Sequence, residues 1–220
     1  MLSPCWCPLG DNVSRVIIFG FRVVMRKKGS GTFHCPNERV DRTYLLKKAQ
    51  RFFTLFFIPL IPLNVVGEIV ECEGCHTKFN PNVLTIPTST QLGERLANAM
   101  RTLIVALLRT SEPATTARRA AAVGVLTRYL PDANDSWLDA DLAAIDPRLL
   151  DEQMQLVGPL LESAGQEALV TNGAWVALAD GPIDDASRAV LERAGIGLGM
   201  TVVHVRGAIT AAIESVHRGS

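Results

Sequence analysis

The sequence predicts an α+β protein of two domains, in which a small N-terminal β module is followed by an all-α helical bundle. The first observation is a pair of short cysteine clusters that flank an apolar, strand-like segment between Phe33 and Phe79. The second is the helical spacing of apolar residues beyond residue 92, after a stretch with proline and a Thr-Ser-Thr run. We expect an extension at residues 1–15, the β module at 16–80, a linker at 81–92 and the bundle at 93–217.

The charge of the chain is balanced overall but unevenly distributed. The formal net charge is +0, so bulk charge offers no argument for nucleic-acid binding. The segment from Arg15 to Arg51 is nevertheless basic, with Glu38 and Asp41 as its acidic residues, whereas the chain after Asp132 is acidic. This asymmetry favours two modules, and it keeps a nucleic-acid-binding β module open as an alternative.

Cysteine usage and hydropathy predict a cytoplasmic protein. All five cysteines precede Lys78, which fits zinc binding in a reducing compartment better than a secreted disulfide scaffold. The most apolar run, residues 52–66, contains Pro59 and Pro62, so we expect no membrane-spanning helix. Residues 1–15 lack the apolar core of a signal peptide, and we interpret them as a disordered or mis-started extension.

The β module is expected to contain two or three strands. Ile17–Val24 predicts a short strand, and the basic, glycine-containing residues 26–31 predict a turn or flexible link after it. The proline-containing stretch 51–61 suits an edge strand or an extended loop, and Val65–Glu71 predicts the strand that leads into Cys72. So small a module needs a metal to fold, and its surplus aromatic residues imply a partner: the other domain, a second copy or a membrane surface.

The two cysteine clusters have the spacing of metal knuckles. In Cys72-Glu73-Gly74-Cys75 a tight turn can direct two thiolates at one ion, with Gly74 supplying backbone freedom. Cys35-Pro36-Asn37-Glu38 has the same spacing but ends in a carboxylate, which zinc also accepts. We predict a structural zinc site of Cys35, Glu38, Cys72 and Cys75, with His34 or His76 as an alternative fourth ligand. Metal-free clusters, a redox Cys-x-x-Cys and a catalytic zinc are the competing interpretations.

Apolar periodicity in the second half predicts a bundle of five to seven helices. The expected helical segments are 92–109, 115–130, one that begins at Asp146, 166–180, 184–195 and 201–216. Pro159 should kink or end the segment that begins at Asp146, and Thr201 suits the N-cap of the last helix.

An acidic loop between two of these helices contains Asp180, Asp184 and Asp185. Three carboxylates so close together could bind a hard cation such as Ca²⁺ or Mg²⁺, with a second acidic loop at 132–135 as a contributor. The structural alternative is that Asp184 caps the next helix. The sequence contains no recognisable nucleophile–base pattern or phosphate-binding loop, so we expect no enzymatic activity and infer no small-molecule substrate.

The first half resembles a bacterial zinc-ribbon module. The resemblance rests on Cys35-Pro36, on the aromatic and proline segment 51–62, on Gly67-Glu68 and on residues 70–75. It covers roughly residues 16–80 and implies a β module clamped by zinc. Glu38 departs from the pattern, because it takes the place of the usual second cysteine.

The second half resembles the tellurite-resistance TerB-like domain. The residues that carry this resemblance are 165–167, 177–184 and 198–201, within a match of about residues 92–216. The resemblance implies an all-helical cytosolic domain, cation binding at acidic loops and a role in stress response near the membrane.

Together these inferences predict a non-enzymatic metal-binding adaptor of the tellurite-resistance or stress-response type. We expect one structural Zn²⁺ in the β module and a cation- or partner-binding helical bundle. A protein partner is expected, and peripheral membrane association is open. The alternative function is a nucleic-acid-binding zinc ribbon that uses the basic region Arg15–Arg51.

Overall fold

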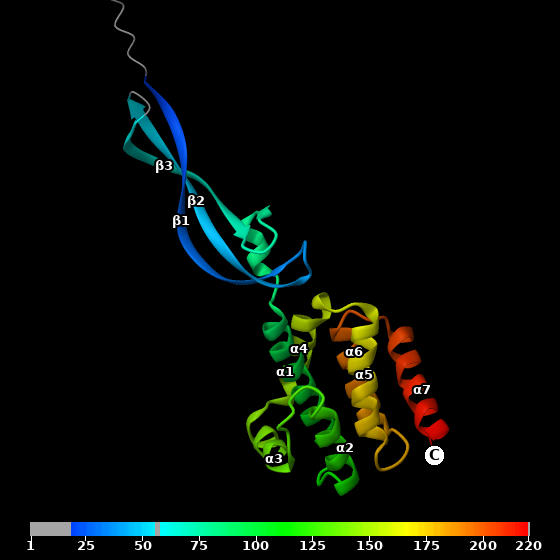
Figure 1. Ribbon diagram of the computed structural model, residues 1–220. Coiled ribbons are helices and arrows are strands. Elements are labelled where there is room, and N and C mark those ends of the chain that lie inside the picture. Colours follow the sequence, from blue (N-terminus) through cyan, green and yellow to red (C-terminus); the bar gives the residue numbers. More distant parts are fainter. Residues whose placement is uncertain (1–18, 56–57, 220) are drawn as a thin grey trace, which may run out of the picture. The chain divides into compact units, whose positions relative to one another are not determined.

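The computed structural model describes residues 19–55 and 58–219 of the chain. The chain divides into two compact units between Thr88 and Ser89. The first holds a four-stranded antiparallel sheet and the second a seven-helix bundle, which confirms the predicted α+β class (Figure 1). The expected extension at 1–15 lies outside the described residues. Within the described part, no helix has the length and apolar character needed to cross a membrane.

The sheet is a long twisted ribbon of three strands with a short fourth strand at one end (Figure 1). Its strands are β1 Phe19–Cys35, β2 Val40–Leu55, β3 Ile58–Cys72 and β4 Lys78–Phe79. They pair in the order β1-β2-β3-β4, and every pair is antiparallel. Because β4 pairs only with Val70 and Glu71, β3 has no described neighbour on its outer side along most of its length.

The expected turn at residues 26–31 is wrong, because β1 continues straight through it. The strand keeps its pairing with β2 and absorbs the irregularity as a register shift between Lys27 and Gly29. Gly31 pairs with Tyr44, and a Cβ at Gly31 would lie 3.1 Å from the Tyr44 ring. Glycine here serves close side-chain packing, so the cross-strand environment overrides the local turn signal.

The prolines of β3 lie on an outer strand, as their missing N–H groups require. Pro59 pairs with Thr54 and Pro62 pairs with Phe52, and register shifts in the β2–β3 pairing lie beside both prolines. Proline has no backbone N–H to donate to a strand ladder. The register shifts between β2 and β3 therefore fall beside residues that cannot complete the ladder hydrogen bonds.

The sheet unit has a small core near the cysteines. Phe33, Cys35, Val70 and Cys72 are buried together, with Tyr44, Phe79, Val83 and Leu84 among the side chains packed against them. The Phe33 ring meets the rings of Tyr44 and Phe79 edge to face, at centroid distances of 5.6 and 5.9 Å.

The stretch expected as a linker, 81–92, is mostly structured. The 3-10 helix η1, Pro81–Thr85, places Val83 and Leu84 on the core of the sheet unit, and the first long helix begins at Ser89. Apolar residues in this proline-rich stretch therefore complete the β module rather than only connect it to the bundle.

The second unit packs its helices around one apolar core. The helices are α1 Ser89–Leu108, α2 Thr116–Leu126, α3 Asp135–Ala144, α4 Leu150–Val157, α5 Ser163–Leu178, α6 Asp185–Gly197 and α7 Val202–Gly219, with 3-10 helices η2 Pro147–Leu149 and η3 Gly158–Leu160. The second half of α1, residues 102–108, is entirely buried, which makes α1 the central helix of the bundle. Pro159 ends α4 as expected, since η3 follows directly.

The helix α3 was missed by the periodicity argument. Its sequence, Asp-Ser-Trp-Leu-Asp-Ala-Asp-Leu-Ala-Ala, buries only Leu138 and Asp141, so it has no clear apolar stripe. Its N-cap is Asn134, whose side chain accepts a hydrogen bond from the backbone N–H of Trp137 at 3.1 Å. The acidic stretch that resembled a cation-binding loop therefore contains a helix start.

Candidate metal centre

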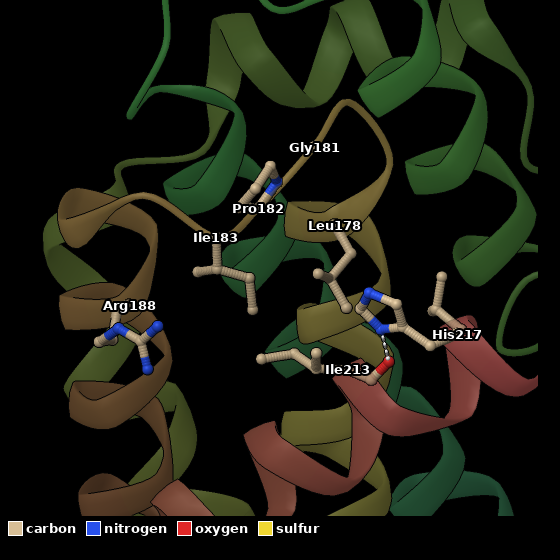
Figure 2. Close-up of a pocket in the computed structure, with 8 residues that line it drawn as sticks. Leu178, Gly181, Pro182, Ile183, Arg188, Ile213 and His217 are labelled. Carbon is tan, nitrogen blue, oxygen red and sulfur yellow. Dashed lines mark hydrogen bonds between the residues drawn. The ribbon is translucent and has the colours of Figure 1, made fainter.

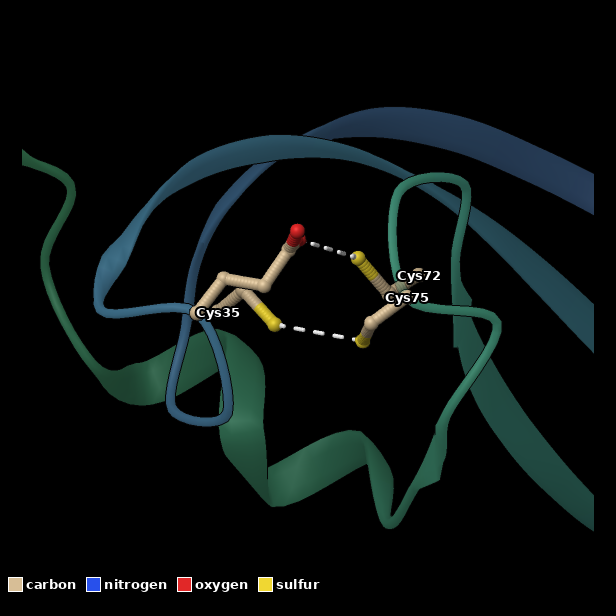
Figure 3. Close-up of side chains that lie close together, drawn as sticks. Cys35, Cys72 and Cys75 are labelled. Atoms are coloured by element: carbon tan, nitrogen blue, oxygen red, sulfur yellow. Dashed lines mark hydrogen bonds between the residues drawn. The ribbon is translucent and has the colours of Figure 1, made fainter.

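Four side chains that can bind a metal meet at the end of the sheet. The Sγ atoms of Cys35, Cys72 and Cys75 and a carboxylate oxygen of Glu38 all lie within 4.8 Å of one another. Figure 3 shows the sulfur of Cys35 facing that of Cys75, and the sulfur of Cys72 facing a carboxylate oxygen. This is the only such group of three or more ligands that the described residues form.

The two knuckles are built in the same way. In the first, the N–H of Arg39 donates to the carbonyl of Cys35 at 2.7 Å. In the second, the N–H of His76 donates to the carbonyl of Cys72 at 3.0 Å. Arg39 has φ 55° and His76 has φ 56°, so both turns close through a left-handed residue four positions after the cysteine. The two turns are therefore equivalent position by position, and Glu38 stands where the second knuckle has Cys75.

The distances between the ligand atoms fit a tetrahedral zinc site. Zinc–sulfur bonds of about 2.3 Å and zinc–oxygen bonds of about 2.1 Å place sulfurs about 3.8 Å apart, and a sulfur and an oxygen about 3.6 Å apart. The Cys35 and Cys75 sulfurs are 3.7 Å apart, and the Cys72 sulfur is 3.8 Å from Glu38 Oε2. A disulfide would need about 2.0 Å. The cluster thus has the dimensions of a metal site rather than of a cysteine pair.

Gly74 makes room for the carboxylate of Glu38. A Cβ at Gly74 would lie 2.6 Å from Glu38 Oε2 and 3.1 Å from Arg42 Nε. The positive φ of this turn is carried by His76, and Gly74 is not among the described glycines with positive φ. The expected role of Gly74, backbone freedom, is therefore wrong. Its function is to leave space for a ligand that comes from the other knuckle.

Arg42 holds Glu38 in place. Its Nε donates to Glu38 Oε2 at 3.0 Å and its Nη2 lies 3.3 Å from Oε1, and this contact raises the pKa of the Arg42 guanidinium. Hydrogen bonds of this kind to a ligating carboxylate orient it toward a metal. With three thiolates and a carboxylate around Zn²⁺, the guanidinium would also offset the excess negative charge.

The thiols differ in how readily they ionise. Burial raises the pKa of Cys72, whose side chain is fully enclosed. Hydrogen bonds from the side chain and backbone of Thr77 lower the pKa of Cys75 to about 6. Cys75 therefore offers a thiolate at neutral pH, and a bound cation would favour the thiolate form of Cys72 as well.

The histidines named as alternative ligands lie outside the group. His34 turns its Nδ1 toward Asp41 Oδ1 at 3.1 Å, and His76 is exposed to solvent. Of the three alternatives for the fourth ligand, Glu38 is the one that lies with the thiols.

We predict that Glu38→Cys binds zinc more tightly than the wild-type chain, by about tenfold or more, because thiolate is the softer ligand and zinc sites favour it. Glu38→Gln should bind more weakly, since it keeps the size of the side chain and removes its charge. Competition with a chromophoric chelator measures all three affinities. Equal affinities for the three chains would contradict the assignment of Glu38 as a ligand.

The second predicted site is occupied by an arginine. Arg118, from α2, donates through Nε to Asp180 Oδ1 at 2.7 Å and through Nη2 to Asp184 Oδ2 at 2.8 Å. Its side chain is 5% exposed. The two carboxylates thus meet around a guanidinium, and Asp185 lies in the first turn of α6. Cation binding by Asp180, Asp184 and Asp185 stays a prediction. A bound cation would have to share the carboxylates of Asp180 and Asp184 with Arg118.

The capping role of Asp184 is confirmed. Its Oδ1 accepts a hydrogen bond from the N–H of Ser187 at 2.7 Å at the start of α6. The loop at 132–135 does not join it, because Asp135 binds the neighbouring Arg119, at 2.7 Å. Sequence reasoning missed Arg118, although a single pair of arginines in the alanine-rich start of α2 was a visible signal.

We predict that acid destabilises the helical bundle partly through Asp184. Its hydrogen bonds with Arg118 lower its pKa from 3.8 to about 2. A carboxyl whose pKa is lower in the folded state stabilises fully above its unfolded pKa, and this contribution is lost as pH falls from about 4 toward 2. Urea unfolding across this range should therefore show a smaller loss of stability for Asp184→Asn than for the wild-type chain. Equal pH dependence in both would contradict the assignment.

The bundle also contains an apolar cavity of about 350 Å³ beside this loop (Figure 2). Leu178, Ile183 and Ile213 line it, with Arg188 and His217 as its charged or titratable residues. His217 Nδ1 lies 2.8 Å from the carbonyl oxygen of Ile213. The cavity therefore offers mainly apolar contact.

Comparison with known proteins identifies no relative. No family model, no curated protein and no solved structure matches the chain. The class that the fold and the site define is therefore an α+β protein with a cluster of three cysteines and one glutamate that could hold a metal ion such as zinc. The zinc-ribbon and TerB-like resemblances stay predictions.

Proposed function

We propose that the chain is a non-enzymatic adaptor whose β module is held together by one structural Zn²⁺ at Cys35, Glu38, Cys72 and Cys75. The observation that carries this proposal is that the four donor atoms lie within 4.8 Å of one another, with separations of 3.7 Å between Cys35 and Cys75 and 3.8 Å between Cys72 and Glu38 that suit a tetrahedral zinc. The four protein ligands fill the coordination of zinc. A catalytic zinc would instead keep one position for water.

The architecture of the β module supports a structural role. Its buried apolar cluster consists of four residues, two of which are the ligands Cys35 and Cys72. So small a core supplies little stability, whereas a structural zinc supplies roughly 10 kcal/mol or more of folding free energy. The ion would join the β1–β2 turn to the end of β3, which are 34 or more positions apart in the chain.

The proposed adaptor role rests on the surface of the β ribbon that would remain accessible to partners when zinc is bound. The metal would fix one end of the β ribbon, and the rest of its surface would be available to partners. The helical unit would add a second binding surface. The proposed role in tellurite resistance or stress response rests on the TerB-like resemblance alone.

Elemental analysis of the purified full chain tests the metal assignment, with about one zinc per chain expected. Substitution by Co²⁺ should add thiolate-to-metal charge-transfer absorption, because three of the ligands are sulfurs. A folded chain that contains no metal and takes up neither ion would overturn the proposal.

A second candidate function is nucleic-acid binding by the β module. It is favoured by the cationic residues of β1 and β2, since the sequence from Phe19 to Gly67 contains only Glu38 and Asp41 as acidic residues. Such binding would weaken steeply as salt rises. Filter binding at low and high ionic strength tests it, and no salt-sensitive retention would remove it.

A further inference from the structure

Large apolar side chains are exposed at the end of the ribbon that lies away from the metal centre. Phe21 and Ile58 are 59% exposed and Ile61 is 55% exposed. The other exposed apolar residues of this part are Val23, Met25, Leu63, Val65 and Val66. Phe21, Val23 and Met25 project from one face of the ribbon, whereas Val65, which pairs with Gln50, projects from the other. Exposed apolar side chains gathered at one end of a sheet mark an interaction site. We call these eight residues the apolar tip.

The apolar tip has an ordered arrangement across the strands. Phe21 pairs with Phe53, and Phe53 pairs with Ile61, so one residue from each long strand stands in the same row. Directly opposite residues project from the same face of a sheet. The rings of Phe21 and Phe53 meet edge to face at 6.1 Å. The row is therefore a continuous apolar band across the width of the ribbon.

Cationic side chains lie on both faces of this part of the ribbon. Lys27 and Arg51 stand on the face of the band, whereas Arg22, Arg26 and Lys48 stand in the alternate rows and therefore on the opposite face. We call these five residues the cationic collar. The guanidinium of Arg51 lies 4.1 Å from the centre of the Phe21 ring, and that of Arg26 lies 4.9 Å from the centre of the Phe52 ring. Each of these two charges thus sits over an aromatic face, with apolar contacts on one side and its charge available to an anion.

The charges decide among the surfaces that could cover the tip. A second copy of the chain would bring two cationic collars together. A nucleic acid would satisfy the charges, but it would leave the aliphatic side chains of Val23, Ile61 and Val66 without apolar contacts.

We propose that the apolar tip and cationic collar dock on the headgroup region of an anionic lipid bilayer. The apolar tip would enter the boundary with the acyl chains end-on, so that collar residues on both faces of the ribbon would contact lipid phosphates and carboxylates. The docking is shallow, because the outer edges of β1 and β3 carry backbone groups that hydrocarbon cannot satisfy. This inference gives the proposed adaptor a partner but uses residues distinct from the metal ligands.

Vesicle flotation with the zinc-loaded full chain tests the proposal. The two probes are vesicles of phosphatidylcholine alone and of phosphatidylcholine mixed with phosphatidylserine. We expect the chain to float with the mixed vesicles, and to bind them at least about tenfold more tightly than the neutral ones at low salt. Phe21→Ser/Ile61→Ser should weaken binding to the mixed vesicles by about tenfold or more. Arg26→Gln/Lys27→Gln should reduce the preference for phosphatidylserine.

The matched control is Val203→Ser, which removes an 81% exposed apolar side chain from α7 in the helical unit. It should bind vesicles as the wild-type chain does. Zinc content is measured in every variant, so a failure of the metal site is distinguishable from a failure of docking. Three outcomes would overturn the proposal: no flotation of the zinc-loaded chain, flotation unchanged by both tip and collar variants, or loss of self-association or nucleic-acid binding in these variants without loss of vesicle binding.

Discussion

Replacing Cys72 by serine should abolish zinc binding and unfold the β module while the helical bundle stays folded. Cys72 is fully buried, and its sulfur lies 3.8 Å from Glu38 Oε2 at the centre of the cluster. A hydroxyl is a poor zinc ligand, so the variant would lose most of the roughly 10 kcal/mol or more that a structural zinc contributes. The bundle has its own core of buried residues and should not depend on this site.

Metal content and limited proteolysis measure this effect together. The zinc content should fall from about one per chain toward zero, and protease should cleave within residues 19–79 while a fragment that begins near Ser89 survives. The control is Cys5→Ser/Cys7→Ser, which removes two thiols that do not belong to the predicted ligand set and should keep the zinc. A Cys72→Ser chain that retains zinc and resists cleavage would contradict the structural role.

Replacing Arg118 by methionine should destabilise the helical bundle by about 2 to 4 kcal/mol. The guanidinium lies nearly buried between the ends of three helices. It binds Ser111, after α1, at 2.9 Å, Asp180, after α5, at 2.7 Å and Asp184, before α6, at 2.8 Å. Methionine fills much of the same space but leaves two carboxylates facing each other without a cation. Because the carboxylates of Asp180 and Asp184 are partly exposed to water, we expect a smaller loss of stability than for a fully buried ion pair.

Denaturant unfolding of the full chain, followed by helical circular dichroism, measures this loss. Arg119→Met is the matched control, since Arg119 is the neighbouring residue and its partners Asp135 and Asp139 are 67% and 66% exposed. Exposed ion pairs contribute roughly 0 to 1 kcal/mol, so the control should remain close to the wild-type chain. Equal effects of the two substitutions would show that Arg118 has no special structural role.

The candidate metal site and the apolar tip lie at opposite ends of the β ribbon. At one end, ligand spacing and a small buried core favour a rigid structure. At the other, aromatic and aliphatic side chains remain exposed, where folding alone gives them no partner. A stable ribbon that carries an exposed apolar surface is what an adaptor requires, because the surface can bind without first having to fold.

Features that depend on residues close together in the chain can be predicted from the sequence alone. The Cys-x-x-Cys turn, the α+β class, most of the helices and the capping role of Asp184 follow from local spacing and periodicity, and the structure confirms the class and the cap. The position of Glu38 in its turn was enough to name it as a candidate ligand, with His34 and His76 as alternatives, because a knuckle directs its first and fourth residues to the same side.

Which distant groups meet depends on strand pairing and helix packing, which the sequence pattern does not specify. The strand through Gly29–Gly31 exists because β2 pairs along it, and α3 forms without an apolar stripe. The space that Gly74 leaves for Glu38 and the position of Arg118 between Asp180 and Asp184 depend on strand register and helix packing. These arrangements join segments up to 66 positions apart, and no local pattern specifies the distance between such segments.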